Sequence, residues 1–179
     1  VVSTQDVDLI EYQPFAEGTK AVLLEEPSSF KIEDNPPVLD GATALYPIYS
    51  AFAQAVYPEK EYPLYAGEVV SSQTSNAFER LLRGEVDMVF MAHPSGQQMK
   101  MAEEQGVSLN LTPIGREAFV FFVHQKNPVE NLTIEQIQGI YSGEMTNWSE
   151  VGGNNEEIHA FQRPEGSGSQ TALINVMNG

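Results

Sequence analysis

The sequence predicts an α/β fold with mainly parallel sheets. Apolar runs of strand length alternate with segments of helical periodicity along most of the 179 residues. Two of these runs, 86–91 and 118–123, are almost wholly apolar, which is typical of strands buried on both faces of a parallel sheet. The length corresponds to about one domain and is sufficient to bury a core.

The composition excludes several classes of protein. The chain has no cysteine, which rules out disulfides, thiolate metal sites and cysteine catalysis. Its formal net charge of −16 argues against binding to nucleic acid or to an acidic membrane surface. A small anion is not excluded, because hydrogen bonds to an anion act at contact whereas distant charges are screened beyond ~8 Å in physiological salt.

The chain begins with an acidic, irregular lead-in over residues 1–37, in which 21–24 is expected to form a short strand. Asp40-Gly41-Ala42-Thr43 is expected to open a helix, with Thr43 as its N-cap and Tyr57 at its end. Its apolar residues recur at the spacing of one helical face: Leu45, Ile48, Tyr49, Phe52, Ala53 and Val56.

Further strands and helices are expected to alternate along the rest of the chain, and the phenylalanines of 119–122 are assigned to the core. The expected strands are 66–70, 86–91, 107–111, 116–124 and 158–161. The expected helices are 76–83 with Gly84 as stop signal, a segment from Pro94-Ser95 to about Gly106, a segment from the capping box Thr133 and Gln136 to about Gly143, and one from Thr171 onward.

Residues 161–171 are the most informative stretch for function. An apolar run leads to Arg163, a Pro/Gly turn follows, and Ser167-Gly168-Ser169 comes before the last helix. Such a turn directs N–H groups, hydroxyls and the positive end of a helix dipole toward one small volume, beside the planar donor group of Arg163. The same residues also fit a simple helix N-cap, and this stretch alone favours the cap.

Two other polar turns, Ala42-Thr43 and Thr74-Ser75, also lie close to the expected start of a helix. Ligands of open α/β sheets bind at the carboxyl ends of the strands, where such turns gather. With the three turns and Arg163 taken together, the sequence favours an anion site about as strongly as simple helix capping.

Metal and hydrolase sites are poorly supported by the sequence. The three histidines, His93, His124 and His159, lack metal-ligand spacing, so no metal is expected. A serine hydrolase built on Ser167 or Ser169 would need the nucleophile-elbow motif, which is missing from the sequence.

Six runs between Asp40 and the end of the chain carry a family resemblance. They are 40–47 (DGATALYP), 85–88 (EVDM), 113–120 (PIGREAFV), 127–132 (NPV followed by LT), 140–148 (IYSGEMTNW) and 163–169 (RPEGSGS). In these runs the sequence resembles the PstS-like phosphate-binding proteins that feed ATP-driven phosphate uptake in Gram-positive bacteria. No single run is specific, but the combination is.

The resemblance implies a type II periplasmic-binding-protein fold, in which crossover strands join two α/β lobes around the ligand. Residues 38–113 would form the first lobe, and 114–179 the crossover and part of the second. Family members continue past the arginine-serine helix, so the chain is expected to be a C-terminally truncated fragment with an incomplete second lobe.

The resemblance also implies a non-catalytic protein without a cofactor. Such a protein is a monomer that captures inorganic phosphate outside the cell and delivers it to the permease subunits of an ABC transporter. It would be secreted, or anchored by a lipid at the outer face of the cell membrane.

Ligand contacts follow from the resemblance position by position. The hydroxyl of Thr43 and the amide of Ala44 would hold phosphate from the first helix, and Ser75 would add a hydroxyl from the second. The remaining contacts would be an ion pair from Arg163 and the hydroxyls and amides of Ser167, Gly168 and Ser169. Ser169 stands where the family usually has threonine, and it keeps the hydroxyl.

One departure from the family bears on selectivity. Many relatives have an aspartate that accepts the proton of phosphate, and this position falls on Ala92. Glu117 and His93 are the candidates to replace it, and Thr74 and Arg116 are further possible contacts. Sulfate, molybdate or tungstate binding and an anion-sensing role therefore stay open as alternatives.

Overall fold

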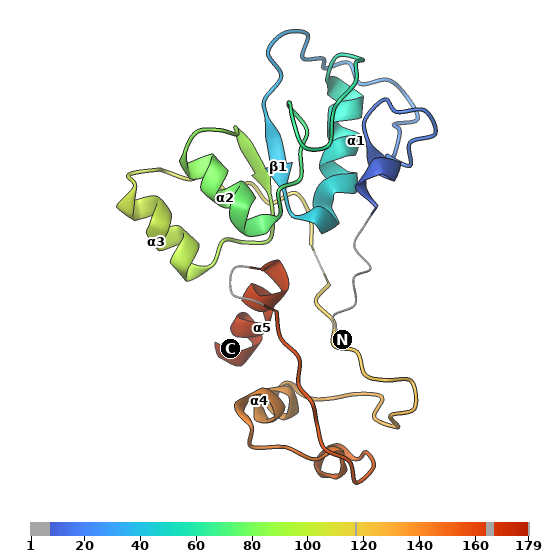
Figure 1. Cartoon of the computed structure of the whole chain (residues 1–179), viewed down its shortest axis with the longest axis vertical. Helices are drawn as coiled ribbons and strands as arrows, with labels where there is room; N and C mark the ends of the chain where they lie inside the picture. The colour runs from blue at the N-terminus through green and yellow to red at the C-terminus, as the bar shows by residue number, and fades with distance from the viewer. Residues whose placement is uncertain (1–7, 117, 164–166, 179) are drawn as a thin grey trace. The chain divides into compact units, whose positions relative to one another are not determined.

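The computed structural model describes residues 8–116, 118–163 and 167–178. The chain forms two compact units, Val1–Thr112 and Pro113–Gly179 (Figure 1). Among the described residues, no helix combines the length and the apolar character that crossing a membrane requires.

The first unit contains a small parallel sheet. Strand β1 (Leu39–Gly41) pairs with β2 (Met88–Phe90). Leu39 also forms a parallel bridge with Val69, so β1 lies between two parallel neighbours. The expected strand 66–70 is reduced to this bridge, because Gly67 has a left-handed φ of 93° that an extended strand does not use.

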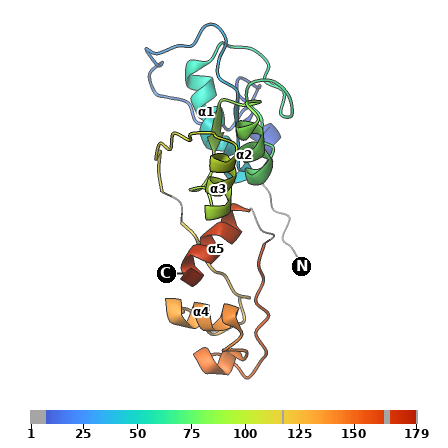
Figure 2. The ribbon, with the colours of Figure 1, turned by 90° about the vertical axis from the view of Figure 1, so that its left-hand side faces the viewer.

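Three α-helices of the first unit follow the expected order (Figure 2). They are α1 (Tyr46–Val56), α2 (Thr74–Leu82) and α3 (Gly96–Glu104). The side chain of Ser95 accepts a hydrogen bond from Gln98 N as part of a capping box, and Gly84 follows α2 with a φ of 68°. The predicted stop at Gly84 and the start of α3 are therefore confirmed.

The expected N-cap at Thr43 is wrong. Thr43 lies inside a 3-10 turn, η2 (Thr43–Leu45), and α1 begins only at Tyr46 without a side-chain cap at Leu45. Pro47 explains the delay, because proline fits the first turn of an α-helix but lacks the N–H that would continue a helix from the N-terminal side. Asp40, expected to open this helix, instead lies in β1.

The larger apolar core of the first unit surrounds α1. Its buried members are Leu39, Tyr46, Tyr49, Ala53, Tyr57, Tyr62, Leu64 and Val69, and a second cluster contains Phe78, Leu82 and Ala102. The lead-in packs on α1 through η1 (Leu9–Tyr12), and the hydroxyl of Ser50 donates a hydrogen bond to the carbonyl of Tyr12. The expected strand at 21–24 does not form, and its three apolar side chains after Ala21 are exposed.

The second unit contains α4 (Ile134–Ser142), η3 (Trp148–Val151) and α5 (Gly168–Asn178). The capping box of Thr133 and Gln136 and the left-handed Gly143 at the end of α4 confirm that predicted helix. The two α-helices pack together, and Gln138 Nε2 donates a hydrogen bond to the carbonyl of Val176 at 2.8 Å.

The strands expected at 107–111, 116–124 and 158–161 do not form in the described part of the chain. A strand is stabilised by pairing, and the described residues of 113–179 provide only one antiparallel bridge, between Asn147 and Glu157. The core assignment of 119–122 is accordingly wrong for Phe122, which is 88% exposed, and Phe119 is also exposed. Phe121 is half-buried against the rings of Phe119 and Tyr141.

Candidate functional site

Three polar turns follow the parallel segments of the first unit at their carboxyl ends. β1 leads into Ala42-Thr43, the segment bridged at Val69 leads into Thr74-Ser75, and β2 leads into Ala92-His93. Two hydrogen bonds join these turns across the sheet: Ala42 N donates to Phe90 O at 2.9 Å, and Ser71 Oγ donates to Gly41 O at 3.4 Å. Ligands of parallel sheets bind at such an edge.

The first of these turns presents the predicted contacts Thr43 and Ala44. Thr43 is half-buried and Ala44 is exposed at the start of η2. No side chain caps η2 at Ala42, so the first N–H groups of this turn have no capping side chain to accept their hydrogen bonds. An anion is one chemical species to which such N–H groups donate hydrogen bonds.

The second turn contains a strained residue that the sequence reasoning missed. Gln73 has a φ of 71°, a left-handed conformation that is uncommon outside glycine, and it immediately precedes Thr74 and Ser75, the first residues of α2. Its side chain does not cap the helix. Backbone strain of this kind concentrates at ligand sites, and no local sequence signal indicates it.

Asp40 is the buried charge beneath this edge, and it was also missed. Its side chain is fully buried and accepts hydrogen bonds from Gly41 N at 2.7 Å, Ser72 N at 2.8 Å and Ser72 Oγ at 2.7 Å. Arg80 of α2 completes the set with a short ion pair to Asp40 Oδ2. Arg80 also lies 3.4 Å from Glu85, so its charge is balanced by carboxylates.

The third turn contains Ala92, which is half-buried and offers no carboxylate, and the exposed His93. The Nδ1 atom of His93 lies 2.9 Å from the carbonyl oxygen of Pro94. A carbonyl only accepts, so Nδ1 donates, and Nε2 of the neutral ring is then an acceptor. Nε2 of His93 is therefore chemically able to accept a hydrogen bond from a ligand, and its role as a replacement for the missing carboxylate stays a prediction.

The other predicted contacts belong to the second unit. Ser167 Oγ accepts a hydrogen bond from Gln170 N at 3.1 Å and so caps the start of α5. Gly168 is the first residue of α5, and Ser169 is exposed. Arg163 is exposed, its own N–H donates to Gln170 Oε1 at 3.0 Å, and its guanidinium has no ion-pair partner among the described residues.

The capping interpretation is thus correct for Ser167. A capping hydroxyl uses one lone pair of its oxygen and keeps its proton, so Ser167 remains able to donate to an anion at the same time. Arg116 is exposed, and Glu117 lies outside the described residues. Whether Arg163 and the serines contact a ligand stays a prediction.

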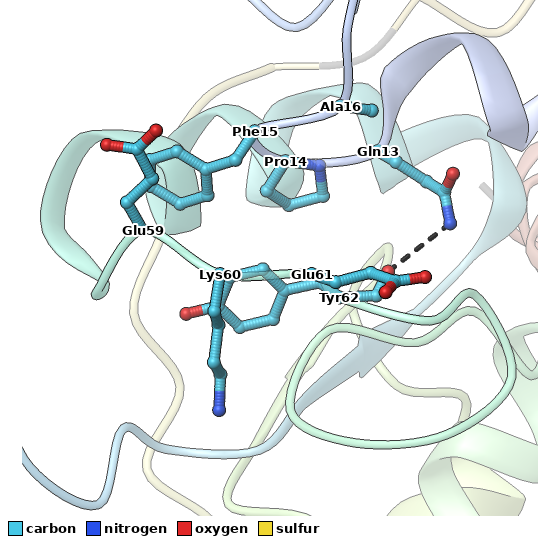
Figure 3. Close-up of a pocket in the computed structure, with 8 residues that line it drawn as sticks. All are labelled: Gln13, Pro14, Phe15, Ala16, Glu59, Lys60, Glu61 and Tyr62. Carbon is cyan, nitrogen blue, oxygen red and sulfur yellow. Dashed lines mark hydrogen bonds between the residues drawn. The ribbon is translucent and has the colours of Figure 1, made fainter.

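A surface pocket with a volume of about 370 Å³ lies elsewhere in the first unit (Figure 3). Its lining is Gln13, Pro14, Phe15, Ala16, Glu59, Lys60, Glu61 and Tyr62, none of them a predicted contact. The rings of Phe15 and Tyr62 stack at 5.9 Å, and Gln13 Nε2 donates to Tyr62 O at 3.3 Å. Two carboxylates against one ammonium make this pocket unsuited to an anion.

No group of three His, Asp or Glu side chains that could hold a metal ion occurs in the part of the chain that the structure describes. The chemistry available at the carboxyl edge of the first unit is instead hydroxyl and amide hydrogen-bond donation.

The sequence pattern of the PBP superfamily domain matches residues 36–179. Over 135 residues the chain is 24% identical to the phosphate-binding protein PstS of Staphylococcus saprophyticus, and over 140 residues it is 23% identical to that of Bacillus subtilis. These alignments cover 73% and 76% of this chain but 41% and 44% of the relatives. The chain thus spans about two fifths of the length of these curated relatives.

Among solved structures, the fold is similar to a protein from Clostridium perfringens that is described as a substrate-binding protein of a phosphate ABC transporter and was solved with bound phosphate. The TM-score is 0.59 at 25% sequence identity, over 80% of this chain and 56% of that one.

Proposed function

Because the chain belongs to the PBP superfamily, we propose that it captures inorganic phosphate outside the cell for delivery to the permease of an ABC transporter. The superfamily comprises binding proteins rather than enzymes, so no covalent step is proposed. The observation that carries the proposal is the gathering of three polar turns at one edge of the parallel segments, in a chain whose relatives are phosphate-binding proteins.

The proposal extends to the fold of the whole protein. We propose that the whole protein is a type II binding protein with two α/β lobes, of which these residues supply one lobe and part of the other. It acts as a monomer at the outer face of the cell membrane, secreted or lipid-anchored. The relatives' names and their greater length support this assignment.

Each unit carries its own set of proposed phosphate contacts. In the first unit they are the Thr43 hydroxyl, the Ala44 amide and the Ser75 hydroxyl, with Thr74 as a further possible contact. In the second unit they are the Arg163 guanidinium and the hydroxyls and amides of Ser167, Gly168 and Ser169. Charge-assisted hydrogen bonds contribute about 1.5–3 kcal/mol each, so a few such bonds are enough to hold an anion on a chain of charge −16.

A second candidate ligand is another tetrahedral oxyanion, such as sulfate, molybdate or tungstate. The observation in its favour is Ala92, since no carboxylate at that position accepts a proton from phosphate or repels a fully ionised anion. His93 is the acceptor that would restore selectivity for phosphate, because its Nδ1 already donates to Pro94 O.

Calorimetric titration of the full chain with phosphate, sulfate and molybdate tests the proposal. We expect the tightest binding for phosphate. Arg163→Ala should weaken it by well over tenfold if the bound anion buries its ion pair with Arg163, since breaking a buried charge pair costs ~3–5 kcal/mol. Arg83→Ala is the matched control, since Arg83 is exposed and pairs with Glu79 and Glu85 on the surface. Equal losses in the two variants, or no anion binding by the unaltered chain, would refute it.

A further inference from the structure

The carboxylate of Asp40 joins three parts of the first unit. It belongs to β1, it accepts two hydrogen bonds from Ser72 in the loop after Val69, and it pairs with Arg80 in the last turn of α2. These partners lie 32 and 40 residues away along the chain. The side chain is fully buried, so these contacts hold it without competition from water.

The residues that Asp40 holds lie on both sides of the second polar turn. Ser72 comes two positions before Thr74, and Arg80 comes five positions after Ser75. One carboxylate therefore joins both the loop that enters α2 and the last turn of the helix to β1. The next residues after β1 lead directly to Thr43 and Ala44.

We propose that Asp40 is a positioning residue, which sets the place of the Thr74-Ser75 turn relative to the Thr43-Ala44 turn at the candidate anion site. This inference rests on the proposed function. Asp40 acts through Ser72 and Arg80 and does not touch the ligand, because protein donors occupy both of its oxygens: Gly41 N and Ser72 N bond Oδ1, and Ser72 Oγ and Arg80 bond Oδ2.

The ion pair also makes a buried carboxylate compatible with an anion site nearby. An unpaired negative charge beneath the turns would repel the ligand, and it would be costly to bury. The guanidinium of Arg80 balances that charge. Because Arg80 pairs with Asp40, it is not itself proposed as a ligand contact. The pair is neutral overall, so the hydroxyl and amide donors of the two turns, rather than a net positive charge, would hold the anion.

A double-mutant cycle on the full chain tests the inference with inorganic phosphate as the probe. Asp40→Asn keeps the size of the side chain and removes its charge. We expect about a tenfold loss of phosphate affinity in the unaltered background but less than about threefold in a Ser75→Ala background, because the effect of a residue that positions the Ser75 hydroxyl is lost once that hydroxyl is removed. A general loss of stability would weaken binding equally in both backgrounds.

Arg83→Gln is the control, since it removes a positive charge at the end of the same helix without contact to Asp40, and it should leave the affinity unchanged. Should Asp40→Asn not fold, Ser72→Ala takes its place in the cycle, because it deletes one hydrogen bond to Asp40 and keeps the backbone one. Additive losses would overturn the positioning role alone. Failure of the unaltered chain to bind any of the three anions would overturn the proposed function, and this inference with it.

Discussion

The rings of Tyr46 and Tyr49 meet edge to face in the core, with centroids 5.3 Å apart and planes at 85°. Both side chains are fully buried on α1. The hydroxyl of Tyr49 donates to Val70 O at 2.8 Å, whereas that of Tyr46 has no hydrogen-bond partner among the described residues. Two neighbouring residues of one type are therefore expected to respond oppositely to the same substitution.

Tyr46→Phe should raise the free energy of unfolding by about 1 kcal/mol, because it removes a buried hydroxyl without a partner. Tyr49→Phe should lower it by about 1–2 kcal/mol, because it leaves the carbonyl of Val70 without its donor. Urea unfolding followed by circular dichroism measures both. A loss of stability in Tyr46→Phe equal to that in Tyr49→Phe would contradict the assignment.

Stability should fall steeply in alkali. Burial raises the pKa of Tyr46 to about 12 from an ordinary value of 10.0. The unfolded chain releases this proton near pH 10 and the folded chain only near pH 12, so folding is fully favoured below pH 10 and loses about 2–3 kcal/mol as the pH rises through that window. Urea midpoints between pH 9 and pH 12 measure the slope, and Tyr46→Phe should make it shallower.

Gly41→Ala should destabilise the first unit. A Cβ at this position would overlap the carbonyl oxygen of Phe90, which is backbone of the paired strand and cannot turn aside. We expect a loss of about 1–3 kcal/mol, as for overpacking in a core. Gly96→Ala is the control, because nothing lies within 4 Å of the added atom, and it should not destabilise. Similar thermal midpoints for the two variants would be the contrary result.

Ser167→Ala and Thr133→Ala separate helix capping from ligand binding. Each removes a side-chain oxygen that accepts from the backbone N–H three residues on, so each should cost about 1 kcal/mol of stability. Only Ser167→Ala should also weaken phosphate binding in calorimetry, because Thr133 begins α4 and is not a proposed contact. A phosphate affinity unchanged in Ser167→Ala would leave Ser167 as a cap alone.

Helix ends could be predicted where the deciding contacts are local. Thr133 and Gln136 form their capping box within three residues, and Gly84 and Gly143 adopt the left-handed conformation that stops a helix. The order of the helices followed from the same local patterns, whereas β1 did not, because Asp40 and Gly41 were assigned to the start of a helix.

Strand formation could not be predicted in the same way, because pairing depends on distant segments. The run 118–123 has the composition of a buried strand, yet Phe122 is exposed where no described neighbour pairs with it. Asp40 is a similar case, since its partners Ser72 and Arg80 are remote in sequence and no local pattern links them. The turns at Thr43 and Ser75 could be identified from their residue types. That both lie at the carboxyl edge of the same parallel segments is known only from the strand register.

The two apolar clusters that surround α1 and α2 both lie in the unit Val1–Thr112. A recombinant piece ending at Thr112 would keep every residue of those clusters, together with Asp40 and its partners, and it should be recovered from the soluble fraction with a cooperative melt. A piece beginning at Pro113 would keep the uncovered phenylalanines and much less buried apolar surface. Limited proteolysis should therefore cut the chain unevenly, degrading the second piece while the first persists.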